Sequence, residues 1–129
     1  MSERYTSPET SRALADAGLS QAMSRAWWSM SLGDPFLNER SPYPVPTINN
    51  YDVRALDLTD VLHELTRPRP EEADARPLVS AWRMYQHEAG STEMCVMRVG
   101  ELYWRDFGGP TPVEAAAACL IALLRERAK

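Results

Sequence analysis

The chain has 129 residues, of which 44% are hydrophobic and 25% charged, and its net charge is −4. These values are typical of one globular domain spanning 1–129, and they argue against a basic surface for nucleic-acid phosphates. The sequence has no run of about eighteen apolar residues and no basic, then apolar, N-terminal region. We therefore expect a protein of the cytoplasm with neither a membrane segment nor a disulfide.

The first half, 7–66, is predicted to be mainly helical. Ser7 and Pro8 form a helix start, and the composition favours helix from Glu9 to Leu32. Gly18 either divides this segment into two helices or is tolerated inside one long helix, the arrangement that we favour, at a cost of about 1 kcal/mol. On such a helix Trp28 lies off the apolar stripe, so it is either a residue at the rim of the core or an exposed anchor for a partner.

The segment 34–55 contains four prolines and is predicted to be a long ordered loop. Its apolar and aromatic residues argue against disorder, and loops of this length in compact domains often bind something. Two interpretations stay open, a covering loop without a binding role and a ligand or partner surface. The candidate binding residues of the second interpretation are Tyr43, Asn49, Asn50 and Tyr51.

A short helix follows, capped by Asp57 or Thr59 and ending before Pro68. Asp60, His63 and Glu64 lie close together on it, but acidic helix surfaces often have this spacing without a metal, and we expect no metal site. The proline-rich segment 67–77 is predicted to be an exposed connector between the helical half and a strand-rich part, 78–107.

Within 78–107 the hydrophobic period changes to two, which predicts three strands at 78–86, 94–99 and 102–107. Residues 89–92 are predicted to form the first turn, and Gly100-Glu101 a two-residue hairpin turn. Large apolar residues occupy both the odd and the even positions of these strands, which point to opposite faces of the sheet. A sheet that is apolar on both faces must be covered on both. The predicted fold class is therefore α+β, a three-stranded antiparallel meander with helices on both faces in an α/β/α sandwich.

The C-terminal segment predicts a long helix over 111–128. Thr111 and Glu114 have the spacing of a capping box, and Pro112 suits the first helical position. The segment 113–124 is apolar almost all round, and a helix of that kind is buried on most of its circumference. We expect this helix to be the main anchor of the core.

A strand-rich segment ends near Trp104 and is followed by the sequence GGPTPVEAAAACLIALLRERA. This part of the chain resembles the C-terminal end of small phage and prophage proteins with a phage ABA-sandwich domain. The upstream segment TINNYDVRALDLTDVLHEL is loosely similar to their middle part. The resemblance covers about 47–128. It implies an accessory protein in the cytoplasm of a bacterial host, and it provides no catalytic residues. The long first helix and residues 34–46 depart from the family pattern.

Three functions remain open from the sequence. The first is association with a host or phage protein through exposed aromatic residues, with homo-oligomers as one form of it. The second is a module that sequesters or senses a small ligand through the 34–55 loop. The third is an enzyme with Cys95 as nucleophile and His87 as its base, although Cys95 lies between apolar residues and is expected to be buried. We favour the first, and expect no enzymatic activity and no cofactor.

Overall fold

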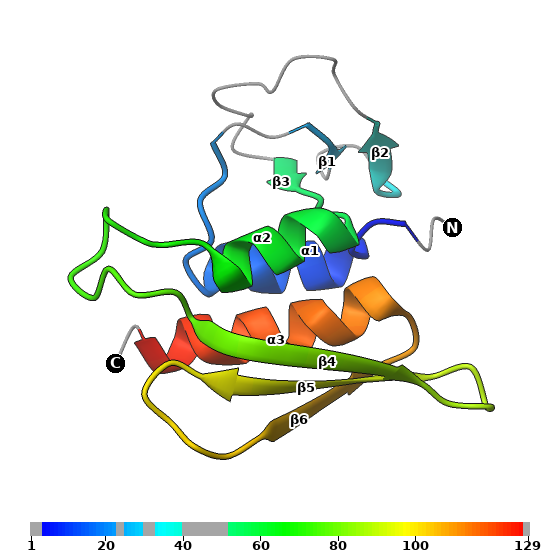
Figure 1. Cartoon of the computed structure of the whole chain (residues 1–129). Coiled ribbons are helices and arrows are strands. Elements are labelled where there is room, and N and C mark those ends of the chain that lie inside the picture. The colour runs from blue at the N-terminus through cyan, green and yellow to red at the C-terminus, as the bar shows by residue number, and fades with distance from the viewer. Residues whose placement is uncertain (1–3, 23–24, 30–32, 40–51, 128–129) are drawn as a thin grey trace.

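The computed structural model describes residues 4–22, 25–29, 33–39 and 52–127, and they form an α+β protein with two separate three-stranded antiparallel sheets (Figure 1). The elements are α1 (Pro8–Asp16), β1 (Trp27–Ser29), β2 (Phe36–Asn38), β3 (Asp52–Arg54), α2 (Leu58–Thr66), β4 (Val79–Gln86), β5 (Thr92–Arg98), β6 (Arg105–Gly109) and α3 (Pro112–Arg127). No helix in these ranges has the length and hydropathy that crossing a bilayer would need.

Helix α3 is the middle layer of the molecule. Figure 1 shows it between the β4-β5-β6 sheet on one side and the pair α1 and α2 on the other. Its buried side chains point in both directions, so the prediction of a helix covered on most of its circumference is confirmed. These residues are Val113, Ala115, Ala116, Ala117, Cys119, Leu120, Leu123 and Leu124.

The larger sheet has the strand order β4-β5-β6, as the predicted meander requires. Cross-strand partners share a face of a sheet, and Met84, Met94 and Phe107, which lie in one row, pack into the core beneath α3. All three helices lie on this side of the sheet (Figure 1). The described residues therefore do not show the expected sandwich, because α1 and α2 cover the second side of α3 instead of the second face of the sheet.

The strand ends differ from the prediction mainly at the second hairpin. Strand β5 ends at Arg98 and β6 begins at Arg105, so the connection is longer than the two-residue turn expected at Gly100-Glu101. Gly100 does adopt a left-handed conformation, with φ 91°. The first turn forms as expected, with hydrogen bonds between the backbones of His87 and Ser91 and of Gly90 and His87.

The prediction of one long first helix was wrong. Helix α1 ends at Asp16, and the amides of Gly18 and Leu19 close its last turn by donating to the carbonyls of Ala15 and Leu14. Gly18 has φ 103°, a left-handed conformation that ends a helix readily at glycine.

Residues Trp27–Ser29 form the central strand of the smaller sheet, whose order is β2-β1-β3. Trp27 pairs with Arg54 and Trp28 with Val53. This sheet and the chain beside it enclose a second apolar cluster made of Tyr5, Ala26, Trp28, Val53 and Ala55.

The helix starts agree with the capping signals. Ser7 accepts the amide of Thr10 at the start of α1, and Asp57 and Asp60 form a capping box on α2. At α3 the Thr111 hydroxyl accepts the Glu114 amide at 3.2 Å. The Glu114 carboxylate, predicted to reach back to Thr111, instead accepts hydrogen bonds from the start of α1.

Candidate functional site

One face of the β4-β5-β6 sheet is turned away from α3, and we call it the outer face. It is the main candidate site. The register assigns to it residues that alternate with those packed under α3. Trp104, just before β6, joins them through its contact with Arg83. The residues of the outer face are Ala81, Arg83, Tyr85, Glu93, Cys95, Met97, Trp104 and Asp106.

Aromatic side chains on the outer face are exposed, and one of them contacts an arginine. The Arg83 guanidinium lies 4.0 Å from the centre of the Trp104 ring, which fits a cation–π contact. Trp104 is 39% exposed and Tyr85 44% exposed. Leu102 and Tyr103, in the connection before β6, are exposed as well. Large exposed apolar side chains that lie together often mark an interaction site.

Cys95 lies in the middle of the outer face. Its side chain is buried, and a hydrogen bond with Asp106, reinforced by desolvation, raises the pKa of the thiol to about 11. His87 Nε2 lies 3.7 Å from Glu93 Oε1. The structure thus pairs the thiol with a carboxylate and the imidazole with another carboxylate. An activated cysteine nucleophile needs a lowered pKa, so this geometry does not support the Cys95 and His87 enzyme.

Trp28, the predicted rim residue or partner anchor, lies in the smaller apolar cluster and is 9% exposed. Its indole Nε1 donates a 2.8 Å hydrogen bond to the Thr6 carbonyl. The segment predicted to be a helix is a strand here, in which Trp28 is the cross-strand partner of the buried Val53. The other candidate binding residues, Tyr43, Asn49, Asn50 and Tyr51, lie outside the described residues.

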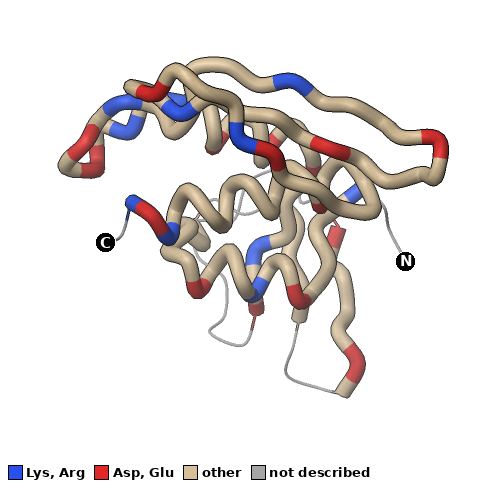
Figure 2. Tube along the Cα trace, turned by 90° about the horizontal axis from the view of Figure 1, so that it is seen from below, with Lys and Arg blue, Asp and Glu red and all other residues tan. Residues whose placement is uncertain are grey.

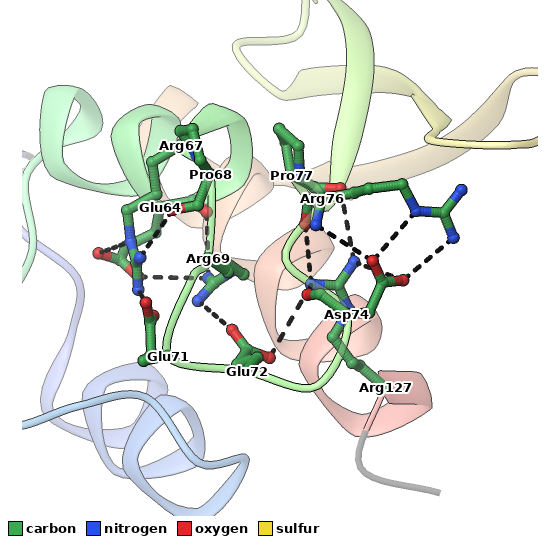
Figure 3. A network of polar contacts seen from close by, with 10 residues as sticks. All are labelled: Glu64, Arg67, Pro68, Arg69, Glu71, Glu72, Asp74, Arg76, Pro77 and Arg127. Carbon is green, nitrogen blue, oxygen red and sulfur yellow. Dashed lines mark hydrogen bonds and ion pairs between the residues drawn. The ribbon is translucent and has the colours of Figure 1, made fainter.

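An ion-pair network fixes the 67–77 segment, for which the sequence predicts an exposed connector (Figure 3). Arg69 is 3% exposed, and its guanidinium contacts Glu64 at 3.2 Å and Glu72 at 2.9 Å. Arg67 contacts Glu64 at 3.1 Å and Glu71 at 2.7 Å. Glu64 therefore serves two arginines and is not available for the Asp60 and His63 group considered from the sequence.

Arg127, near the end of α3, connects this segment to the core. Its guanidinium donates to the carbonyls of Arg76 at 3.1 Å and of Asp74 and Pro77 at 3.4 Å (Figure 3). The hollow beside the network is lined by three arginines and three glutamates, so its charges balance. Since the arginines are engaged by carboxylates and carbonyls, the network holds a loop in place and offers no cationic site to an anion.

Comparison with known proteins identifies no relative: no family model, no curated protein and no solved structure matches this chain. The resemblance to the phage ABA-sandwich proteins stays a prediction.

Proposed function

We propose that this protein acts by protein–protein association through its outer face, and that the occupant of this face is a second copy of the same chain. The observation that carries the proposal is the exposure of Tyr85 and Trp104 on a sheet face that no described helix covers. Tyrosine, tryptophan and arginine are enriched at interfaces, where their burial contributes most of the binding energy.

The charges in one row of the outer face are self-complementary. Arg83, Cys95 and Asp106 lie in one row across the three strands, with the cation at one end and the carboxylate at the other. A second copy turned by 180° about an axis parallel to β5 places each Arg83 opposite the other copy's Asp106. A two-fold contact repeats every such pair, which is the arrangement that closes a dimer.

The mixture of signs also distinguishes this face from one made for a polyanion. Figure 2, which views the molecule from the side of the sheet, shows acidic and basic positions mixed over the described chain. If the outer face packs on the same face of a second copy, with the two sheets aligned and about 10 Å apart, its aromatic and methionine side chains become buried.

The size of the face predicts weak, concentration-dependent association. Three strands of this length cover about 20 Å by about 15 Å, from the usual rise and strand spacing. That is smaller than the roughly 800 Å² per partner of a standard interface. Such a dimer would also supply the cover on both faces that the sequence led us to expect, with the second layer coming from the other copy.

Sedimentation of the reduced protein in chelator, at concentrations from micromolar to millimolar, tests the proposal. We expect a monomer–dimer equilibrium in the wild type. Arg83→Glu and Asp106→Arg, each alone, should weaken the dimer because they place like charges opposite each other. The double variant should restore it, because the charges exchange places.

Arg12→Glu is the matched control, since Arg12 is exposed on α1, far from the sheet. It changes the net charge as much as Arg83→Glu and should leave the dimer unchanged. A wild type that stays monomeric overturns the proposal, and the outer face is then a site for a different protein, such as the predicted host or phage partner. Dimerisation that both single variants retain overturns it as well.

A further inference from the structure

Three potential metal ligands meet on the outer face. Glu93 and Cys95 are two residues apart on β5 and so share a face, and Asp106 on β6 is the cross-strand partner of Cys95. One ligand atom from each residue, two carboxylate oxygens and the thiol sulfur, lies within 4.8 Å of the others.

A fourth donor comes from a different element. His87 follows β4 at the start of the turn, and its Nε2 lies 3.7 Å from Glu93 Oε1. His87, Glu93 and Asp106 line one hollow of the surface, together with Gly108 and Gly109. The His87 side chain is 53% exposed, so the imidazole can turn toward a bound ion without disturbing the core.

The spacing of these atoms is close to that of a zinc site. Zn–O and Zn–N distances near 2.0–2.2 Å and a Zn–S distance near 2.3 Å put tetrahedral ligands about 3.3–3.8 Å apart. His87 and Glu93 are already at this separation, and the ligand atoms of Glu93, Cys95 and Asp106, within 4.8 Å of each other, need to close by about 1 Å. Rotation of the Glu93 and Asp106 carboxylates, neither of them buried, can supply that movement.

The donor set also selects the class of metal. A thiolate and an imidazole favour zinc and similar borderline ions, whereas Mg²⁺ and Ca²⁺ prefer sites made of oxygen alone. We propose that Glu93, Cys95, Asp106 and His87 form a binding site for a divalent cation of the zinc class. The site does not depend on the association of two copies, since all four donors belong to one chain.

A thiol must lose its proton to bind a metal, so a cation at Cys95 displaces that proton. The bound cation also neutralises the carboxylates that stand beside the thiol.

Titration of the reduced, chelator-stripped chain with Co²⁺, followed by displacement with Zn²⁺, tests the site. We expect a thiolate-to-cobalt charge-transfer band in the near ultraviolet that Zn²⁺ abolishes at one equivalent and that excess Mg²⁺ leaves unchanged. Cys95→Ser should abolish the band, while Cys119→Ala, which removes the thiol buried in α3, should retain it.

Asp106→Asn keeps the thiol and should weaken Zn²⁺ binding by roughly tenfold or more, so the site is tested even if Cys95→Ser folds poorly. His87→Ala should likewise weaken binding, with His63→Ala on α2 as its control. Absence of a thiolate band, or a band that survives in Cys95→Ser, overturns the proposal. Equal affinity of the wild type and Asp106→Asn for Zn²⁺ does so too.

Discussion

Glu114, in the first turn of α3, accepts a 2.6 Å hydrogen bond from the hydroxyl of Thr10 in the first turn of α1. The same carboxylate accepts the Ser7 amide at 3.1 Å. One acidic side chain thus joins the starts of two helices that are about one hundred residues apart in the sequence, and it does so next to the positive end of both helix dipoles.

We therefore expect Thr10→Val to lower the free energy of unfolding by about 1.5–3 kcal/mol, the usual range for a hydrogen bond to a charged group. Chemical denaturation measures the change. Thr66→Val is the matched control, because the Thr66 hydroxyl is exposed and bonds only within its own helix, to the Leu62 carbonyl. Equal losses in the two variants would show that the link between α1 and α3 adds no stability.

Gly109, at the end of β6, marks a close approach of the sheet to α3. A Cβ atom there would lie 2.6 Å from the Ala115 amide nitrogen, whereas at Gly108 the nearest atom would be the Thr92 carbonyl oxygen at 3.8 Å. Gly109→Ala should cost about 1–3 kcal/mol of stability, because backbone must move to admit the methyl group. Gly108→Ala should cost much less in the same thermal or chemical denaturation series, and the reverse order would contradict the close contact.

Trp28 should contribute to the stability of the fold. Trp28→Phe keeps an aromatic ring but leaves the Thr6 carbonyl without its indole donor, in a buried place. Because the Thr6 carbonyl keeps only a longer, 3.4 Å hydrogen bond from the Ser11 hydroxyl, we expect a loss of about 1 kcal/mol, the usual net contribution of one hydrogen bond. Trp82→Phe, at a position that is 40% exposed, is the control and should change stability little. If Trp28→Phe leaves the unfolding transition unchanged, the indole hydrogen bond is unimportant.

Arg69 and Arg76 allow a buried ion pair to be compared with an exposed one in the same segment. Arg69→Met leaves the Glu64 carboxylate buried with Arg67 as its remaining partner, and should cost about 3 kcal/mol. Arg76→Met removes an exposed pair with Asp74, which water screens, and should cost much less. Denaturation at low and high salt separates them, since only the exposed pair should be sensitive to salt. Similar costs for both would mean that burial of Arg69 adds nothing.

The Cys119 thiol should make stability depend on alkaline pH. Burial in α3 raises its pKa to about 12, above the value of about 8.5 for a free thiol. Because the folded state keeps a proton that the unfolded chain loses, this contribution is complete below about pH 8.5 and is lost as the pH rises toward 12. Between pH 8 and pH 11 the free energy of unfolding of the wild type should therefore fall more than that of Cys119→Ala. Chemical denaturation at a series of pH values measures this, and a difference in unfolding free energy that stays constant from pH 8 to pH 11 would contradict the prediction.

Local signals in the sequence were enough to place the last two helices. Asp57 and Thr111 each provide a side-chain cap, and Pro112 fixes the first residue of α3, so both starts were predicted from neighbouring residues alone. The alternation after Leu78 likewise predicted three strands. These features depend on interactions within a few residues, which a single sequence displays directly.

Features that depend on distant partners were not predicted. Trp27–Ser29 has the local composition of a helix, and it is a strand because it pairs with Asp52–Arg54. The sequence showed that α3 is apolar on nearly every side, but it did not show which elements would cover each side. The meeting of Glu93, Cys95 and Asp106 required the register of β5 against β6, and the role of Arg69 required a fold that brings the 67–77 segment against α2 and α3.

The position of α3 between two layers also determines when the core can close. Both partner layers precede α3 in the sequence, so a ribosome produces the β4-β5-β6 sheet and the α1 and α2 pair before the helix that separates them. Until α3 leaves the exit tunnel, each layer exposes the side that α3 will cover. Nascent chains halted before Pro112 should therefore be sensitive to protease and should recruit chaperones, and protection should be gained in a single step once the helix is released.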